Sequence, residues 1–189
     1  ACPCMCRLPA ATPSERCLSE VNTGILAVSA AKLRGWVAEL NNDNSQGEYY
    51  LTDVVALAVR DGVRVEPFAV AEPAEVQGVN DRRQLADLER FYQARQAENL
   101  MRGGATLLDP ARVDVRGVVA TGRDVVIDVN VVFEGTVRLG DRVRIGPFCV
   151  LKDAVIGDDV EVHSHCRIEG AEIGAAAQIG PFARLRPDT

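Results

Sequence analysis

An aliphatic residue returns about every sixth position through the C-terminal part of the chain. These leading residues follow one another at spacings of 6, 6, 5, 6, 6, 5, 6 and 6, and they are Leu139, Ile145, Leu151, Ile156, Val162, Ile168, Ile173, Ile179 and Leu185. Every third lead therefore repeats after 17 residues. A unit this short cannot bury its apolar face alone, so successive units must stack on one another. The spacing predicts a parallel β-helix with three sides per coil and one short strand on each side.

The fifth position of most six-residue units is small, which favours a triangular interior with one large and one small inward side chain per strand. The small residues are Val143, Cys149, Val155, Val160, Cys166, Ala177 and Ala183. Glycine suits tight corners because it tolerates backbone angles that other residues avoid, and it follows the leads at Gly140, Gly146, Gly157, Gly174 and Gly180. The segment VVIDVNVVFEG, at 125–135, extends the pattern toward the N-terminus. We expect the β-helix to run from about Val118 to Thr189, with Ile145, Val162 and Ile179 stacked on one face.

Residues 15–80 alternate between predicted strands and predicted helices. The runs VNTGILAVS (21–29) and VRVEPFAV (63–70) predict strands. The segment 29–40 predicts a helix with Ser29 as its N-cap and one apolar face, made of Leu33, Trp36, Val37 and Leu40. The segment 52–62 predicts a second helix, capped by Thr52 or Asp53 and ended by Gly62. So few strands indicate the final part of a larger α/β domain.

A longer helix is predicted at 81–104, DRRQLADLERFYQARQAENLMRGG. Asp81 and Gln84 have the spacing of a capping box, and the glycines at 103 and 104 end the pattern. Apolar residues recur at helical spacing, at Leu85, Leu88, Phe91, Tyr92 and Leu100. We interpret this segment as a charged linker helix that joins two domains.

Charge and hydropathy exclude two classes of function. The formal net charge is −6, and lysine and arginine are scattered along the chain, which argues against a nucleic-acid-binding surface. No apolar run approaches the roughly 20 residues that a membrane span needs. The first residues, ACPCMCRLPAATPSER, contain no apolar core of signal-peptide length. A cytoplasmic location is the resulting expectation.

The six cysteines fall into groups with different expectations. Cys2, Cys4 and Cys6 form C-x-C-x-C, which differs from the usual spacing of zinc ligands, so we do not expect a metal site there. Cys17 stands alone. Cys149 and Cys166 occupy the small inward position of a repeat unit, where a reduced cysteine behaves as a small apolar residue. We expect both of these thiols to be reduced and buried.

Five segments of the sequence, taken together, resemble a known protein family. In chain order they are E-V-N-T-G-I-L, N-N-x-N-x-Q-G-E-Y-Y-L-T-D, E-x-x-G-V-N-D-R, L-x-D-P-A-R and I-G-P-F-A-R-L-R-P. The ordered set closely resembles the bacterial bifunctional N-acetylglucosamine-1-phosphate uridyltransferase/glucosamine-1-phosphate acetyltransferase family, from about residue 15 to 189. The resemblance implies an α/β nucleotidyltransferase-type partial domain at 15–80, a linker helix at 81–104 and the N-terminal coils of a left-handed β-helix acetyltransferase domain at 105–189. Residues 1–14 match nothing in the family, and we expect them to be disordered.

The resemblance also implies substrates and partners. An acetyl group would pass from acetyl-CoA to glucosamine 1-phosphate. The resulting N-acetylglucosamine 1-phosphate would then react with UTP, assisted by Mg²⁺, to give UDP-N-acetylglucosamine for peptidoglycan and lipopolysaccharide. The family forms homotrimers through the β-helix, which is the implied assembly here.

Three residues match family contacts to substrate. Asn22 in VNTG corresponds to the asparagine that contacts the sugar of UDP-N-acetylglucosamine. Asn80 in GVND corresponds to a residue that touches the nucleotide sugar and helps to hold Mg²⁺, a role that suits a hard amide oxygen. Arg186 in RLRP corresponds to an arginine at the sugar-phosphate site of the acetyltransferase, and a guanidinium fork suits phosphate. Within GEYYLTD, three further residues would line the sugar pocket: Glu48, Tyr50 and Thr52.

Each of these assignments has a plainer alternative. Tyr49 and Tyr50 could instead pack against the start of the helix that follows them. Arg186 could be a solvated side chain on the coil surface. His163 and His165 could in principle form a catalytic or metal site with Cys166, but the repeat directs Cys166 inward and the two histidines outward. We therefore expect neither histidine to have such a role.

The chain also departs from the family pattern. It contains no G-x-G, whereas the family uridyltransferase uses a loop of the form G-x-G-T-R-M to hold the triphosphate. The acidic Mg²⁺ ligand, the histidine base and the acetyl-CoA-binding coils have no counterpart in these 189 residues. We therefore expect no catalytic residue, and neither activity, in this polypeptide by itself. The alternative function is a non-catalytic β-helix module that serves assembly.

Overall fold

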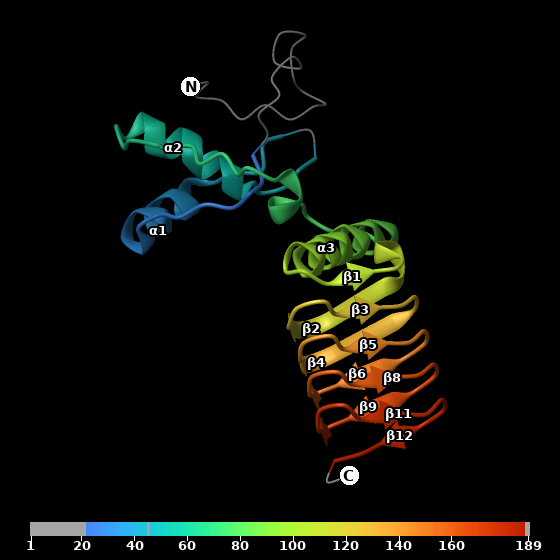
Figure 1. Ribbon diagram of the computed structural model, residues 1–189. Coiled ribbons are helices and arrows are strands. Elements are labelled where there is room, and N and C mark those ends of the chain that lie inside the picture. The colour runs from blue at the N-terminus through green and yellow to red at the C-terminus, as the bar shows by residue number, and fades with distance from the viewer. Residues whose placement is uncertain (1–21, 45, 188–189) are drawn as a thin grey trace. The chain divides into compact units, whose positions relative to one another are not determined.

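The computed structural model describes residues 22–44 and 46–187, which fall into two compact units, one up to Val79 and one from Asn80 onward. Residues 1–14 and the cysteines at positions 2, 4, 6 and 17 lie outside the described residues. The N-terminal unit is helical and the C-terminal unit is a helix followed by a parallel β-helix (Figure 1). Among the described residues, no helix has the length and apolar character needed to cross a membrane.

The C-terminal unit contains three parallel ladders of short strands, one for each side of a coil. The first ladder runs β1-β3-β5-β8-β11, and the other two share the long strands β2 and β4 before they continue as β6-β9-β12 and β7-β10. The strands are β1 (Thr106–Leu107), β2 (Val113–Thr121), β3 (Val126–Ile127), β4 (Val131–Leu139), β5 (Arg144–Ile145), β6 (Val150–Lys152), β7 (Val155–Ile156), β8 (Glu161–Val162), β9 (Arg167–Glu169), β10 (Glu172–Ile173), β11 (Gln178–Ile179) and β12 (Arg184–Leu185). The structure therefore confirms the predicted order of helices followed by a three-sided left-handed β-helix.

The register confirms the predicted repeat. Ile145 pairs with Val162, and Val162 pairs with Ile179, so the three residues stack on one face at intervals of 17. Earlier coils are longer, since Val126 of β3 pairs with Arg144 of β5 and Thr106 of β1 pairs with Val126. The β-helix begins at Thr106, before the Val118 start that the repeat alone indicated, because the first coils depart from strict six-residue spacing.

The inward leads form one continuous core. Those from Leu139 to Ile173 are buried, and Ile179 and Leu185 pack against them. Of the small inward positions, Val155 was assigned wrongly: it is 42% exposed, and Ala154 is buried in its place. The reason is the five-residue unit at 151–155, which moves the second inward position one residue toward the N-terminus. The same shift places Ala171 inside in the equivalent unit one coil later.

Glycines at corners such as Gly140 are required for space, whereas the sequence predicted them for their backbone angles. The residues with left-handed φ at the corners are mostly not glycine; they include Asp124, Arg142, Asp159, Phe148, His165 and Phe182. Gly140 is needed for space, since an added Cβ would lie 2.3 Å from Asp158 Oδ1. That carboxylate oxygen accepts a hydrogen bond from the backbone N–H of Asp141 at 2.8 Å. The Gly-Asp pair therefore ties one corner to the next coil.

Helix α3 (Arg82–Arg102) covers the first coil of the β-helix (Figure 1). Its end is a Schellman motif, in which Ala105 N–H donates to the carbonyl of Leu100 and Gly104 N–H to that of Met101. The predicted apolar stripe is only partly the buried face. Leu85 is 57% exposed and Tyr92 is also exposed, whereas the buried residues are Gln93, Ala97 and Leu100.

Gln93 is a polar residue that faces the core, and its hydrogen bonds explain why it can be buried there. Its Oε1 accepts a hydrogen bond from Val115 N–H at 2.7 Å, and its Nε2 donates to Val115 O at 3.0 Å. This side chain therefore satisfies both backbone groups of one residue on strand β2, as a neighbouring strand would. Arg90 adds an ion pair with Asp114 at 2.9 Å. α3 thus covers an edge of the first coil that would otherwise be open to pairing.

The described residues of the N-terminal unit form a pair of helices, α1 (Ala30–Glu39) and α2 (Val54–Arg60), with two short 3-10 helices, η2 (Leu51–Asp53) and η3 (Pro73–Val76). In the part of this unit that the structure describes, Trp36, Val54 and Ala58 are buried, and Leu33 and Leu40 pack against them as predicted. Val37, expected on the same face, is instead exposed. The expected caps at Ser29 and Asp53 make no side-chain hydrogen bond to the helix starts.

Neither predicted strand of this unit is present. The described residues of 21–29 and all of 63–70 have no strand assignment. A strand is completed by hydrogen bonds from a neighbouring strand, and the described part of the unit offers none. Phe68, in the second segment, is 90% exposed. Apolar sequence pattern alone therefore did not suffice to form strands here.

Charged groups join α1 to α2. Arg60 donates to both carboxylate oxygens of Glu39 and to Asp61, and Asp61 accepts a hydrogen bond from the Trp36 indole N–H at 2.8 Å. The hydrogen bonds from Arg60 lower the pKa of Glu39 and of Asp61, with a further contribution from Trp36 at Asp61. A carboxylate with a lowered pKa stabilises the fold at high pH and loses that effect as the pH falls through its folded pKa.

We predict that the N-terminal unit loses stability as the pH falls below about 4, the region where Glu and Asp ordinarily titrate. Trp36 is the single tryptophan, so its fluorescence during urea unfolding reports on this unit alone. The midpoint should fall between pH 7 and pH 3, and Arg60→Met should remove most of that difference. An unchanged pH difference in the variant would show that other groups cause it.

A second prediction concerns Gln93. Gln93→Ala leaves a buried backbone N–H and C=O of β2 without partners, at a cost of about 1–3 kcal/mol for each buried group. We expect the free energy of unfolding of the β-helix, followed by far-UV circular dichroism, to fall by about 2–4 kcal/mol. Gln96→Ala is the matched control, since Gln96 lies on the same helix and its side chain donates to the hydroxyl of Tyr92, another residue of that helix. Equal losses in the two variants would contradict the role given to Gln93.

Candidate functional site

The three predicted site residues lie in different parts of the structure. Asn22 belongs to the N-terminal unit and precedes α1, Asn80 immediately precedes α3, and Arg186 follows β12 in the last coil. All three are exposed. Within the C-terminal unit, Asn80 precedes helix α3, which covers the first coil, whereas Arg186 follows β12 in the last coil. The structure does not bring these two residues into one site.

Asn22 is held in an Asx turn. Its Oδ1 accepts a hydrogen bond from Gly24 N–H at 2.6 Å, and Gly24 has a φ of 80°. The turn fixes the direction of the side chain. The amide Nδ2 takes no part in this turn, so it is the group that Asn22 can offer to a ligand.

The loop before α2 is organised by an asparagine that the sequence did not single out. Asn44 Oδ1 accepts hydrogen bonds from the backbone N–H groups of Gln46 and Glu48, and its Nδ2 donates to Glu48 O at 2.6 Å. Its signal in the sequence is weak, because N-N-D-N-S-Q-G indicates only a turn. The local result is a loop whose shape depends on side-chain hydrogen bonds.

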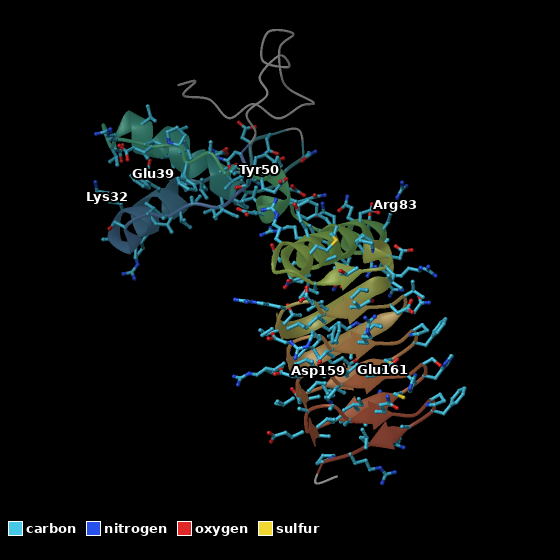
Figure 2. All side chains as sticks on the ribbon, viewed as in Figure 1. Lys32, Glu39, Tyr50, Arg83, Asp159 and Glu161 are labelled. Carbon is cyan, nitrogen blue, oxygen red and sulfur yellow. The ribbon has the colours of Figure 1, made fainter. Side chains whose placement is uncertain are left out.

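The two tyrosines of GEYYLTD differ. Tyr50, labelled in Figure 2, is half-buried, and its hydroxyl donates to Gln46 Oε1 at 2.7 Å. Tyr49 is 67% exposed, so it contributes little to packing at the start of the helix. Glu48 is exposed and Thr52 is half-buried. An exposed ring beside a fixed polar loop is a surface that a sugar could contact.

Asn80 can supply one hard oxygen ligand. Its backbone N–H donates to Gln84 Oε1 at 2.8 Å, while its side chain has no hydrogen bond among the described residues. The neighbouring carboxylate of Asp81 accepts a hydrogen bond from Gln84 N–H at 2.7 Å and caps α3. Mg²⁺ commonly takes only one or two protein ligands, together with water and substrate phosphates. Asn80 Oδ1 therefore fits as a single ligand of a shared magnesium ion.

Arg186 lies on the exposed surface of the last coil, beside Arg184 of β12. The following residue, Pro187, lies close to Gly170 of the preceding coil, where an added Cβ would meet the proline ring at 2.8 Å. Gly170 has a φ of 62°, so glycine is favoured there for its backbone as well as for space. This close contact holds the RLRP segment against the β-helix.

The histidine pair lies on the surface, as the repeat phase indicated. The ring of His165 is stacked between Phe148 and Phe182, with centroids 4.9 Å apart on both sides. His163 is exposed one strand position past β8. In the part of the chain that the structure describes, no group of three or more His, Cys, Asp or Glu side chains could hold a metal ion. Stacking between two phenylalanine rings therefore gives His165 a structural role at this position.

Cys149 and Cys166 are free and buried, as predicted. Each thiol contacts a carbonyl oxygen of the next coil, His163 O at 3.1 Å for Cys149 and Gly180 O at 3.0 Å for Cys166. Burial raises the pKa of Cys149 to about 11. A thiol with so high a pKa is almost entirely protonated near neutral pH and is a poor nucleophile.

We predict slow labelling of both thiols in the native protein. Treatment with iodoacetamide at pH 8, followed by mass spectrometry of the peptides, should modify Cys149 and Cys166 only on the time scale of unfolding. In guanidinium chloride both should react within minutes. Rapid modification of both native thiols would contradict their predicted burial.

The architecture on its own defines a class of protein: a hexapeptide-repeat β-helix, capped by a helix and preceded by a second unit. No family model matches the chain. It is 60% identical over 180 residues to "Bifunctional protein GlmU" of Methylococcus capsulatus, 59% identical over 179 residues to that of Marinobacter nauticus and 58% over 179 residues to that of Alkalilimnicola ehrlichii. Each match covers 95% of this chain and 39% of the relative. The chain belongs to the GlmU family and spans about two fifths of the length of these relatives.

Proposed function

We propose that this chain is part of a bifunctional enzyme of UDP-N-acetylglucosamine synthesis. One activity transfers the acetyl group of acetyl-CoA to glucosamine 1-phosphate. The other, assisted by Mg²⁺, joins N-acetylglucosamine 1-phosphate to UTP and releases pyrophosphate. The product would supply peptidoglycan and lipopolysaccharide, including lipid A. The observation that carries the proposal is 60% identity to a bifunctional GlmU protein over 95% of the chain.

The uridyl-transfer step uses residues before the β-helix in this proposal. Asn22 Nδ2 would donate to the sugar of UDP-N-acetylglucosamine, and the segment 46–53 would line the sugar pocket through Glu48, Tyr50 and Thr52. Asn80 would contact the nucleotide sugar and supply one oxygen to Mg²⁺. The metal, when bound, offsets the negative charge of the phosphates during the transfer.

The acetyl-transfer step uses the opposite end of the C-terminal unit. Arg186 would hold the phosphate of glucosamine 1-phosphate through its guanidinium group. An arginine that is fixed by the neighbouring backbone loses less conformational entropy on binding than a mobile one. The contact between Pro187 and Gly170 supports this role, because it restrains the residue next to Arg186.

Assembly as a homotrimer through the β-helix, in the cytoplasm, belongs to the same proposal. UTP and acetyl-CoA are cytoplasmic metabolites, which favours that location. The β-helix surface also supports the second candidate function, a non-catalytic assembly module. Val118, Phe148 and Phe182 are exposed on it at 65%, 51% and 75%. Exposed apolar residues of this kind favour association, with or without catalysis.

The 189 residues by themselves should have neither activity. They contain no G-x-G loop for the triphosphate, and the loss of one preorganised donor typically lowers kcat by about 10²–10³. The histidine base of the acetyl step also has no counterpart here, and general-base catalysis typically contributes about 10²–10⁴ in rate.

A chimera tests the proposal. Residues 15–189 replace the homologous segment of the Methylococcus capsulatus GlmU protein, and both half-reactions are assayed as acetyl-CoA consumption and pyrophosphate release. We expect both activities in the chimera and neither in residues 1–189 above a no-protein control. A folded, trimeric chimera without either activity would favour the assembly module.

Two substitutions in the chimera separate the sites. Arg186→Ala removes a charge-assisted contact worth about 1.5–3 kcal/mol, so the KM for glucosamine 1-phosphate should rise about 10- to 100-fold while uridyl transfer is unchanged. Asn22→Ala should weaken the uridyl step alone. Arg184→Ala is the matched control for Arg186, being the adjacent exposed arginine. Equal effects of the two arginine variants would contradict the role of Arg186.

A further inference from the structure

Asn80 is anchored to the C-terminal unit by one hydrogen bond. Its backbone N–H donates to Gln84 Oε1 at 2.8 Å, and this is its single hydrogen bond within the described part of the chain. The residues before it, 77–79, are exposed, and Gly78 has open space around it. The conformation at Asn80 therefore depends on Gln84 more than on its preceding neighbours.

Gln84 holds both residues at the start of α3. Its backbone N–H donates to Asp81 Oδ1 at 2.7 Å, while its side chain accepts from Asn80. In an ordinary capping box the side chain at this position reaches back to the N-cap residue itself. Here it reaches one residue further and bonds to Asn80. The residue held by the Gln84 side chain is therefore Asn80, which the proposed function places at the nucleotide sugar and Mg²⁺.

The other end of α3 is fixed to the β-helix. Gln93 is 3% exposed and makes both backbone hydrogen bonds of Val115. Ala97 and Leu100 are buried in the β-helix core. An α-helix is a stiff element with a rise of about 1.5 Å per residue. A continuous series of ordered contacts therefore leads from the first coil, through α3 and Gln84, to Asn80.

We infer that Gln84 is a positioning residue for Asn80, and that the β-helix unit thereby sets the geometry of a ligand contact used in uridyl transfer. The inference rests on the proposed function, since it takes the role of Asn80 from there. Gln84 itself touches neither substrate nor metal in this scheme. Its effect is to fix the backbone from which the Asn80 amide projects, and so to reduce the ordering that ligand binding must impose.

The test uses the chimera and a binding measurement. Calorimetric titration with UDP-N-acetylglucosamine in the presence of Mg²⁺ gives a Kd for each variant. Gln84→Ala should raise this Kd roughly three- to tenfold, the equivalent of one lost neutral hydrogen bond. Gln84→Glu keeps an acceptor for the Asn80 N–H and should restore the original value. The KM for glucosamine 1-phosphate should not change in either variant.

Two comparisons distinguish positioning from general helix stability. Asp81→Ala removes the N-cap of α3 but keeps the Gln84–Asn80 bond, so it should lower the melting temperature at least as much as Gln84→Ala with a smaller effect on Kd. Gln96→Ala, further along the same helix, should leave Kd unchanged. If Asp81→Ala and Gln84→Ala raise Kd equally, the effect is helix stability and the inference is wrong.

The failure of the inference is separable from failure of the proposed function. If Asn80→Ala weakens binding and Gln84→Ala does not, Asn80 has its proposed role and Gln84 has none. If Asn80→Ala leaves Kd unchanged, the ligand role of Asn80 is wrong and the inference fails with it. Hydrogen exchange at the Asn80 amide in residues 1–189 checks the bond directly, since Gln84→Ala should accelerate it.

Discussion

Coil-to-coil hydrogen bonding between parallel strands, which pair 17 residues apart in the later coils, is the constraint on which the C-terminal unit depends. Arg144 N–H donates to Val160 O at 2.9 Å, and His163 N–H donates to Ile179 O at 2.9 Å. Each short strand has only two or three residues, so no single strand could persist alone. Stability comes from stacking, because each coil buries its apolar leads only against its neighbours. Exposed side chains contribute as well, since Asp158 accepts a hydrogen bond from the backbone N–H of Asp141 in the preceding coil.

A stack of this kind must be closed where it begins. The first coil presents backbone groups that would otherwise pair with another chain. Helix α3 closes it with Gln93, a polar side chain that substitutes for a strand, and with the apolar residues Ala97 and Leu100. This explains why the most buried polar residue of the unit lies in a charged helix. The helix is therefore a structural part of the β-helix unit, whatever else it connects.

The repeat was predictable from sequence because it is local and periodic. Spacing alone gave the three sides, the register of Ile145 with Val162 and the burial of Cys149 and Cys166. Gln93 was not predictable in this way, since a glutamine in a helix normally faces water and its partner, Val115, lies 22 residues away. Val155 was misplaced because a five-residue unit changes the inward phase by one position. The predicted inward position was therefore wrong by one residue, since Ala154 is buried and Val155 is exposed.

Candidate site residues were harder to predict from the sequence than the repeat, because they are not part of a periodic pattern. Asn22, Asn80 and Arg186 were found by resemblance, since an exposed asparagine or arginine has no periodic signal. The helical caps show the same limit: Ser29 and Asp53 have suitable side chains but make no capping bond, whereas Gln84 reaches past the N-cap to Asn80. Composition indicates which residues can form such bonds, and geometry decides which of them do.

The distance between the two proposed sites follows from the same architecture. A β-helix lengthens by about 4.8 Å for each coil and has no hinge along its ladders. The proposed ligand contact at Asn80 precedes the helix that covers the first coil, and the one at Arg186 lies in the last coil, so the stacked coils separate them. Communication between them by a change of shape would have to disrupt several ladders at once. Under the proposed function, we therefore expect a substitution at either contact to affect ligand binding there and to leave the other contact unchanged.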